Sequence, residues 1–274
     1  MKIAHLSDIH FGRIAYPEIV EVLVAEINAM AVDLVIVSGD LTQRARPRQF
    51  EEAVAMLDAF TAPVLVVPGN HDVHAWWHRP FLRLFRPLRR YRQYVTDNLS
   101  PSLERETLAV LGVNSAHGWT IKGGFIRAET RARIGAFFVS QQAEAFKILV
   151  VHHPLMRIEA LGKRDVARRA RPTLQAAAHA GVDLILCGHW HLSHVEPVEP
   201  VPGRRLVMAC AGTATCNRWR TPQHGANYYN VIDVTAGGFT VEERLYDIRA
   251  RAYGAARRTP FERQALRLDE GGSI

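Results

Sequence analysis

Short apolar runs alternate with amphipathic stretches over the first seventy residues, and this alternation constrains the fold more than any other feature. The runs KIAHLS, LVIVS and PVLVVP have the length of strands and are apolar nearly throughout, as in a sheet covered on both faces. The stretches between them, EIVEVLVAEINAM and RQFEEAVAMLDAF, carry apolar residues at helical spacing. The order strand, helix, strand, helix, strand predicts a mostly parallel sheet in the α/β class.

A second part of the chain repeats this design. An apolar run, KILVV, is followed by a helical segment, RPTLQAAAHA, and by another apolar run, DLILCG. The later runs RLVMACAG, NYYNVIDV and GFTVEERLY are expected to form antiparallel strands, because short turns join them. Two sheets are therefore predicted.

Residues 73–107 depart from this pattern and predict an inserted, basic, helical cap. Six arginines lie within residues 79–92 among aromatic and leucine residues, while Pro80 and Pro87 argue against one uninterrupted helix. The cap can be a solvated surface, a substrate lid, a membrane or lipid contact, or a dimer interface, and the sequence leaves these open. We expect the main domain to span residues 1–246 and residues 247–274 to form a charged, solvent-facing, partly helical tail.

Composition and charge bound the class of protein. The 274 residues suffice for one large domain, and the formal charge of +7 suits anionic partners. No apolar run approaches the ~20 residues of a membrane-spanning helix, and the first residues lack the apolar stretch of a signal peptide. We therefore expect a cytoplasmic protein. The three cysteines are too few and too scattered for a disulfide framework or a thiolate metal site.

Five short fragments place polar side chains directly after predicted strands. They are DIH with Asp8 and His10, GD with Asp40, GNHD with Asn70 and His71, HHP with His152, and GHWH with His189 and His191. Ligands bind at the carboxyl ends of strands in open α/β sheets, so these donors should meet in one crevice. Asp8 and His10 are two residues apart, as are His189 and His191, so each pair of side chains would point to the same side if its segment were extended. Gly39, Gly69 and Gly188 precede these residues and predict tight turns with positive φ.

The type and order of these fragments resemble the calcineurin-like metallophosphoesterases over roughly residues 1–235, with the closest likeness to the class III cyclic nucleotide phosphodiesterases. The resemblance implies a four-layer α-β-β-α sandwich of two mixed β-sheets flanked by helices. It also implies two metal ions, and the mixed carboxylate, imidazole and amide donors suit Mn, Fe, Zn, Co or Ni.

The resemblance further implies a role for each matching residue. Asp8, His10 and His191 would bind one metal, Asn70, His152 and His189 would bind the other, and Asp40 would bridge both together with a hydroxide that attacks phosphorus. His71 would stabilise or protonate the leaving oxygen, and both Asn70 and His71 would contact substrate. Asp72 is expected either to orient His71 or to cap the next segment. His153, beside the predicted ligand His152, is expected to be a supporting or surface residue.

The segment GTATCNRWR, residues 212–220, resembles a loop of the cyclic nucleotide branch of the family. It offers Arg218 as a substrate contact, with Arg220 beside it, although an ordinary basic loop would look the same. Arg13 and Arg44 lie near predicted ligands and are open to the same two interpretations.

The function that these observations favour is a metal-dependent phosphodiesterase acting on a cyclic nucleotide such as cyclic AMP. A UDP-diacylglucosamine-type lipid pyrophosphatase is the main alternative, and the basic cap favours it, although those relatives commonly have arginine where this chain has His71. A nuclease resembling the double-strand-break repair subunit would hold nucleic acid by charge. A scaffold without activity is the least favoured reading, because no predicted ligand is missing. An oligomer remains open.

Overall fold

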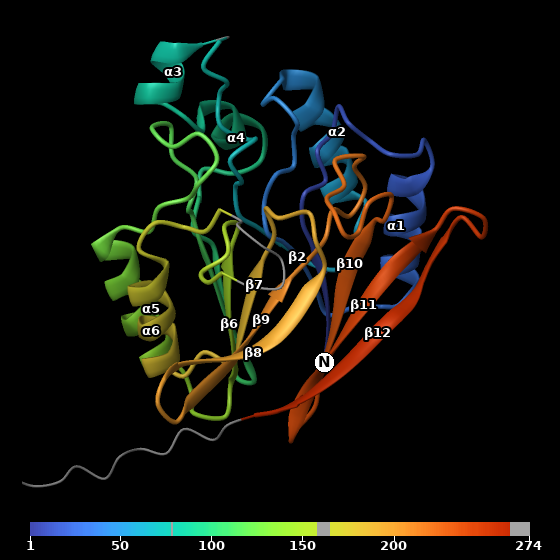
Figure 1. Ribbon diagram of the computed structural model, residues 1–274. Helices are drawn as coiled ribbons and strands as arrows, with labels where there is room; N and C mark the ends of the chain where they lie inside the picture. Colours follow the sequence, from blue (N-terminus) through green and yellow to red (C-terminus); the bar gives the residue numbers. More distant parts are fainter. Residues whose placement is uncertain (78, 158–164, 264–274) are drawn as a thin grey trace, which may run out of the picture.

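The computed structural model describes residues 1–77, 79–157 and 165–263, and within these it has two six-stranded β-sheets with helices on their outer faces (Figure 1). The first sheet contains β1 (Lys2–Leu6), β2 (Leu34–Val37), β3 (Val64–Val66), β10 (Tyr228–Val234), β11 (Gly238–Asp247) and β12 (Ala252–Glu262), in the order β12-β11-β10-β1-β2-β3. The second contains β4 (Ser102–Arg105), β5 (Leu108–Val113), β6 (Phe146–Val151), β7 (Leu184–Cys187), β8 (His194–Val201) and β9 (Arg204–Cys210), in the order β4-β5-β6-β7-β9-β8.

The helices divide between the two sheets. Buried residues of α1 (Ile19–Ala29) and α2 (Pro47–Asp58) pack on the first sheet, and those of α5 (Ala128–Val139) and α6 (Ala170–His179) pack on the second. Two short helices, α3 (Pro80–Phe85) and α4 (Arg89–Tyr94), lie at the upper end of the molecule (Figure 1). The predicted four-layer α-β-β-α sandwich is confirmed.

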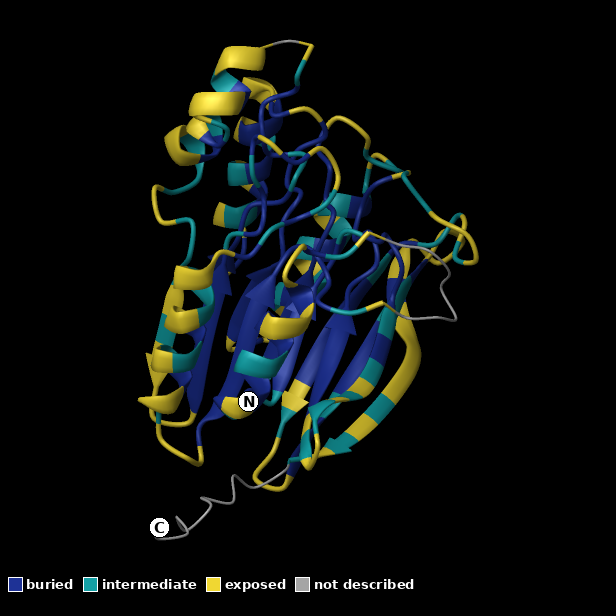
Figure 2. Ribbon diagram, turned by 60° about the vertical axis from the view of Figure 1, so that its left-hand side comes forward, coloured by how far each residue is buried: buried dark blue, intermediate teal, exposed yellow. Residues whose placement is uncertain are grey.

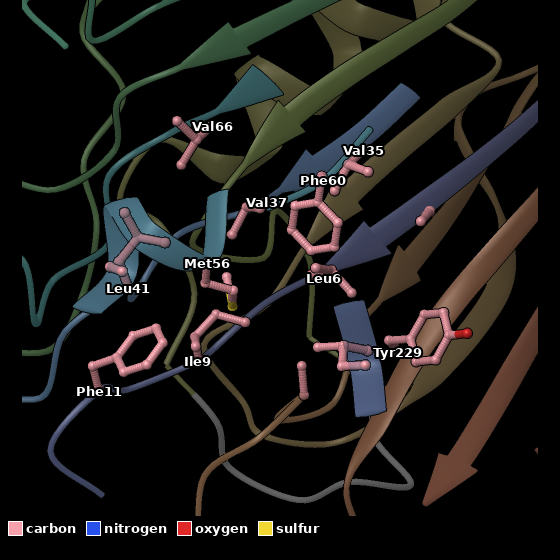
Figure 3. Close-up of a cluster of buried hydrophobic side chains, with 14 of the residues drawn as sticks. Leu6, Ile9, Phe11, Val35, Val37, Leu41, Met56, Phe60, Val66 and Tyr229 are labelled. Carbon is pink, nitrogen blue, oxygen red and sulfur yellow. The ribbon is translucent and has the colours of Figure 1, made fainter. Parts of the chain in front are cut away.

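Three apolar clusters fill the three spaces between these layers. In β2, Val35 and Val37 face the cluster that includes α1 and α2 (Figure 3), whereas Leu34 and Ile36 face the cluster between the sheets. A third cluster joins the second sheet to α5 and α6. Because each central strand buries both faces, its sequence is apolar nearly throughout, as the runs in the sequence are.

Parallel pairing brings several strand ends together. β1 pairs in parallel with β2, and β2 with β3. In the second sheet β5, β6, β7 and β9 pair in parallel in that order. The carboxyl ends of these strands lie at the upper edge of the sheets in Figure 1, beneath α3 and α4.

The last strands differ in part from the prediction. β10 and β11 are antiparallel, as expected, but β9 pairs in parallel with β7 and is antiparallel only to β8. β9 and β10 also belong to different sheets, so no short turn joins them. Residues 211–227 instead cross from one sheet to the other, a path that a long connection allows and that strand patterns alone do not specify.

The end of the described chain and the cap also differ from what we predicted. Residues 247–274 are predicted to be a partly helical tail, but Ala252–Glu262 forms β12, the edge strand of the first sheet, and residues 264–274 lie outside the described part. Charged side chains are common on exposed edge strands, which explains this arginine-rich composition. Within residues 73–107, Ser102–Arg105 is not helical but forms β4 of the second sheet. No helix among the described residues is long and apolar enough to cross a membrane.

Candidate metal centre

The predicted ligands lie in turns that follow the strands, and these turns have unusual backbone conformations. Five residues have left-handed φ angles between 53° and 70°: Asp8, His10, Asp40, His189 and His191. A left-handed conformation costs a residue other than glycine about 1–3 kcal/mol, and such residues cluster at functional sites. The expectation that DIH and GHWH are extended is therefore wrong, since each reaches one crevice through two left-handed residues.

The glycines beside these residues act mainly through their small size. Of the three, only Gly39 has a positive φ, of 103°. A Cβ on Gly69 would lie 2.1 Å from Oδ1 of Asp40, and a Cβ on Gly188 would lie 1.7 Å from Oγ of Ser7. The prediction of positive φ is thus wrong for Gly69 and Gly188, where close packing excludes any side chain.

One group of donors gathers around His10. Its Nε2 lies 3.1 Å from Nε2 of His191 and 3.5 Å from Oδ1 of Asp8. Nε2 of His191 lies 3.1 Å from the same Asp8 oxygen. All three side chains are buried, and the backbone carbonyl of Thr42 lies 3.3 Å from Nδ1 of His10, on the far side of the ring.

A second group gathers around Asn70. Its Oδ1 lies 3.1 Å from Nε2 of His152 and 2.9 Å from Nδ1 of His189. The carbonyl of Ser38 accepts a hydrogen bond from Nδ1 of His152 at 2.8 Å, which fixes that ring with Nε2 toward the group.

Asp40 lies between the two groups. Its Oδ2 is 3.6 Å from Nε2 of His10 in the first group and 3.3 Å from Nε2 of His152 in the second. Its other oxygen, Oδ1, accepts a hydrogen bond from the backbone N–H of His71 at 2.7 Å. The seven side chains predicted as ligands are therefore brought together as two sets with Asp40 between them.

The charges in this cluster perturb one another strongly. Burial alone would raise the pKa of Asp40, but His152 and His71 outweigh burial and hold that pKa well below its usual range. Burial would lower the pKa of His152, but Asp40 raises it to about 9. In the same way Asp8 overcomes burial and raises the pKa of His191 to about 10. The carboxylates thus hold protons on two imidazoles that face them.

Two further side chains, His153 and Cys216, have donor atoms within 4.8 Å of predicted ligand atoms. His153 lies beside His152 and His189, but Oγ of Ser115 occupies its Nδ1 at 2.7 Å and the carbonyl of Lys122 its Nε2 at 3.0 Å. With both nitrogens bonded, His153 has a supporting role, as predicted.

Cys216 is the second of these side chains. Its sulfur and the ligand nitrogens of His10 and His191 lie within 4.8 Å of one another, and Oγ1 of Thr213 lies 2.8 Å from the sulfur. Cys216 lies in no recognisable metal-ligand spacing, so its sequence position did not indicate a place at the site.

His71 is oriented by a backbone carbonyl. Its Nδ1 donates to the carbonyl of Gln43 at 2.9 Å, so its Nε2 carries no proton. Burial, with His10 and Arg218 adding to it, lowers the pKa of His71 to about 3. The imidazole is therefore neutral near pH 7.

The prediction that Asp72 orients His71 is wrong. The Asp72 carboxylate instead accepts hydrogen bonds from the backbone N–H groups of Leu41, Thr42 and Gly69 and from the Thr42 hydroxyl. It therefore fixes the loops that carry Asp40 and Asn70. This role is close to capping, the second role that we expected for Asp72.

The crossing segment, residues 211–227, serves two purposes. The hydroxyls of Thr213 and Thr215 donate to the carbonyls of Asp8 and Ile9 at 2.8 and 2.9 Å, so these threonines hold the DIH turn in place. Further along, Nη1 of Arg218 donates to Nε2 of His71 at 2.6 Å. The two residues are 147 positions apart, so the fold alone creates this pair.

The donor groups open into a cavity of about 790 Å³ with a basic, aromatic lining. The lining includes the cations Arg13, Arg44, Lys122, Arg218 and Arg220 and the indoles of Trp76, Trp77, Trp190 and Trp219. The guanidinium of Arg44 lies 4.7 Å from the centre of the Trp77 ring, over its face. Sequence proximity to the predicted ligands did indicate Arg13 and Arg44, whereas nothing in the sequence indicated the indoles.

Comparisons with a family profile and with individual relatives point to the same family of phosphoesterases. The sequence profile of the calcineurin-like phosphoesterases matches residues 1–193. Glycerophosphodiester phosphodiesterase GpdQ from Enterobacter lignolyticus is 28% identical over 203 residues, which are 70% of this chain and 71% of that protein. A probable GpdQ from Arcobacter nitrofigilis is 27% identical over 213 residues, 70% of this chain and 72% of that protein.

The fold has counterparts among solved structures. A dimetal phosphatase from Danio rerio superposes with a TM-score of 0.69 at 12% identity, covering 96% of this chain and 99% of that one. GAP50, described as the anchor in the inner membrane complex of Plasmodium, superposes with a TM-score of 0.61 at 11% identity, covering 96% of this chain and 89% of that one. At such identity these likenesses concern the fold alone. With the family profile matching most of its length, the chain belongs to the calcineurin-like phosphoesterases and is a hydrolase acting on phosphoric ester bonds.

Proposed function

We propose that this protein is a phosphodiesterase that works with two metal ions. Asp8, His10 and His191 would hold one ion, and the second set, Asn70, His152 and His189, would hold the other. Asp40 would contact both. The observation that carries the proposal is the position of Asp40 Oδ2, within 3.6 Å of His10 and 3.3 Å of His152.

The spacing of the donor atoms fits small cations. Ligands that lie 2.0–2.2 Å from one ion are roughly 2.8–3.6 Å from each other in tetrahedral or octahedral geometry. The distances within the two sets run from 2.9 Å, between Asn70 and His189, to 3.5 Å, between His10 and Asp8. Nε2 of His10 and Nε2 of His191 face each other at 3.1 Å, a separation that two nitrogens bound to one cation would also have.

The chemistry follows from this arrangement. Bound there, two cations would lower the pKa of water and offset the charge on phosphoryl oxygens. Arg218 would donate hydrogen bonds to the phosphate or to the leaving oxygen, because a guanidinium presents several N–H donors in one plane. His71 would position Arg218 through its unprotonated Nε2. We assign the donor role to Arg218 rather than to His71, because the low pKa of His71 leaves the ring neutral and its only N–H faces the carbonyl of Gln43.

The substrate class that we propose is a small phosphodiester with polar substituents. The basic lining of the cavity suits an anionic substrate, and the relatives named above are glycerophosphodiester phosphodiesterases. A cyclic nucleotide is the second candidate. Trp77 at the cavity, with the guanidinium of Arg44 over its ring, favours it, because a planar base can stack on such a surface.

A substrate panel tests the proposal. Purified protein loaded with Mn²⁺ should hydrolyse bis(p-nitrophenyl) phosphate and glycerophosphodiesters, and chelation of the metal should abolish the activity. Cleavage of cyclic AMP at a comparable kcat/KM would support the second candidate. Hydrolysis of phosphomonoesters with no diester activity would contradict both, and Asp40→Ala serves as the inactive control.

A further inference from the structure

Six of the eight large apolar side chains that are exposed in the described residues lie on the cap or on the neighbouring loop that Arg83 joins to it. We name this group the cap face, and its members are Trp77, Phe81, Leu84, Phe85, Trp119 and Ile121. Phe81 is 79% exposed and Phe85 is 73% exposed. The helices at the top of Figure 2 are correspondingly exposed over most of their surface. An isolated apolar residue on a surface needs no explanation, but several exposed apolar side chains on one short helix mark an interaction site.

The cap face is held in place by a buried arginine. Phe81, Leu84 and Phe85 share one side of α3, because they are spaced by three and four residues. Arg83 points to the other side and donates to the carbonyls of Gly118, His74 and Thr120. Since Arg83 is only 4% exposed and satisfies three carbonyls, it fixes α3 to the loop that carries Trp119 and Ile121. The apolar side chains are thus displayed on a supported surface.

The charged side chains of cap residues 73–96 all have one sign. Residues 73–96 contain six arginines and no aspartate or glutamate. Arg79, Arg86 and Arg89 are exposed, and no ion pair is formed by any of them in the part of the chain that the structure describes. An anionic partner would therefore meet unpaired cations beside exposed aromatic rings.

We infer that the cap face docks on an anionic phospholipid bilayer. Aromatic and leucine side chains that enter the boundary between head groups and acyl chains, with arginines beside them, are the combination that holds proteins at such a surface. Contact with a second copy of the chain through the same face is disfavoured, because two acid-free arginine clusters would be brought together. The mouth of the cavity, which Trp77 and Ile121 also line, would then open at the bilayer surface.

Vesicle flotation of the full-length protein tests the inference without any turnover. We expect the protein to float with vesicles of phosphatidylcholine mixed with phosphatidylglycerol, and to bind far less to phosphatidylcholine alone or at high salt. Phe81→Ser with Phe85→Ser should weaken the binding at least about tenfold, because two large apolar side chains no longer enter the bilayer. Arg86→Gln with Arg89→Gln should reduce mainly the preference for the anionic lipid.

A matched variant controls for the loss of apolar surface as such. Val139 and Ile248 are 70% and 53% exposed and lie outside the cap, so Val139→Ser with Ile248→Ser should bind vesicles as the wild type does. Melting temperatures and circular dichroism verify folding independently of any enzymatic activity. Absence of vesicle binding, equal binding to uncharged vesicles, or equal loss in the control variant would each overturn the inference. So would a dimer in size-exclusion chromatography that the Phe81 and Phe85 substitutions dissolve.

Discussion

The most direct test of the site's geometry is to add one methyl group at Gly69. A Cβ there would lie 2.1 Å from Oδ1 and 2.3 Å from the backbone N of Asp40, more than 1 Å short of ordinary van der Waals contact. A rotation of the Asp40 side chain could relieve the first overlap but not the second. Gly69→Ala must therefore move the backbone that carries Asp40, Asn70 or both.

The expected cost follows from that displacement. A shift of about 1 Å in a reacting or positioning group can reduce turnover about 100-fold, which corresponds to about 2.7 kcal/mol. We expect Gly69→Ala to lower kcat/KM for bis(p-nitrophenyl) phosphate by at least that factor and to lower the metal content of the purified protein. Steady-state kinetics at saturating Mn²⁺ and elemental analysis measure the two effects.

Gly135→Ala is the matched control, since a Cβ on Gly135 meets nothing within 4 Å. Gly135 lies within α5, where alanine is favoured over glycine by roughly 0.5–1 kcal/mol, so this variant should be fully active and slightly more stable. A folded Gly69→Ala protein with activity within a few-fold of the wild type would refute the argument that close packing at Gly69 fixes Asp40.

Three further predictions concern the polar groups of the site. Asp40→Asn keeps the acceptor for the His71 N–H but removes the charge between the two donor sets, so metal content and kcat should both fall, the latter at least about 100-fold. The pKa is about 9 for His152 and about 10 for His191, so both imidazoles are protonated near pH 7.5 when no metal is bound. Metal binding at that pH should therefore release protons, and the metal affinity should weaken as the pH falls. Calorimetry in buffers of different ionisation enthalpy measures the release, and finding none would contradict this prediction. Arg218→Gln should lower kcat roughly 100-fold while the metal content stays normal. His71→Gln should retain more activity than His71→Ala, because the glutamine side chain can still accept a hydrogen bond from Arg218. Equal losses of activity in the two His71 variants would instead argue that His71 is a proton donor.

The parts of the site that could be predicted are those encoded within a few residues. Apolar runs define the strands, and polar residues directly after a run mark its carboxyl end, so Asp8, Asp40 and His152 were found without any structure. The geometry of DIH was not predicted, because the direction of a side chain depends on φ, and the left-handed angles of Asp8 and His10 are imposed by the neighbouring loops. The role of Asp72 stayed open between two alternatives for a similar reason, since adjacency in sequence to His71 says nothing about which backbone donors its carboxylate meets.

Hydrophobic periodicity and residue order are local properties, and they were enough to specify the class of fold, the strand ends that carry the donors and the family to which the chain belongs. Which groups face one another depends on how the whole chain folds. The tertiary structure made β12 an edge strand, fixed α3 to a distant loop through Arg83, and brought Arg218 to His71. Such contacts depend on the path of the chain between the two sheets, and that path is set by packing over the whole molecule.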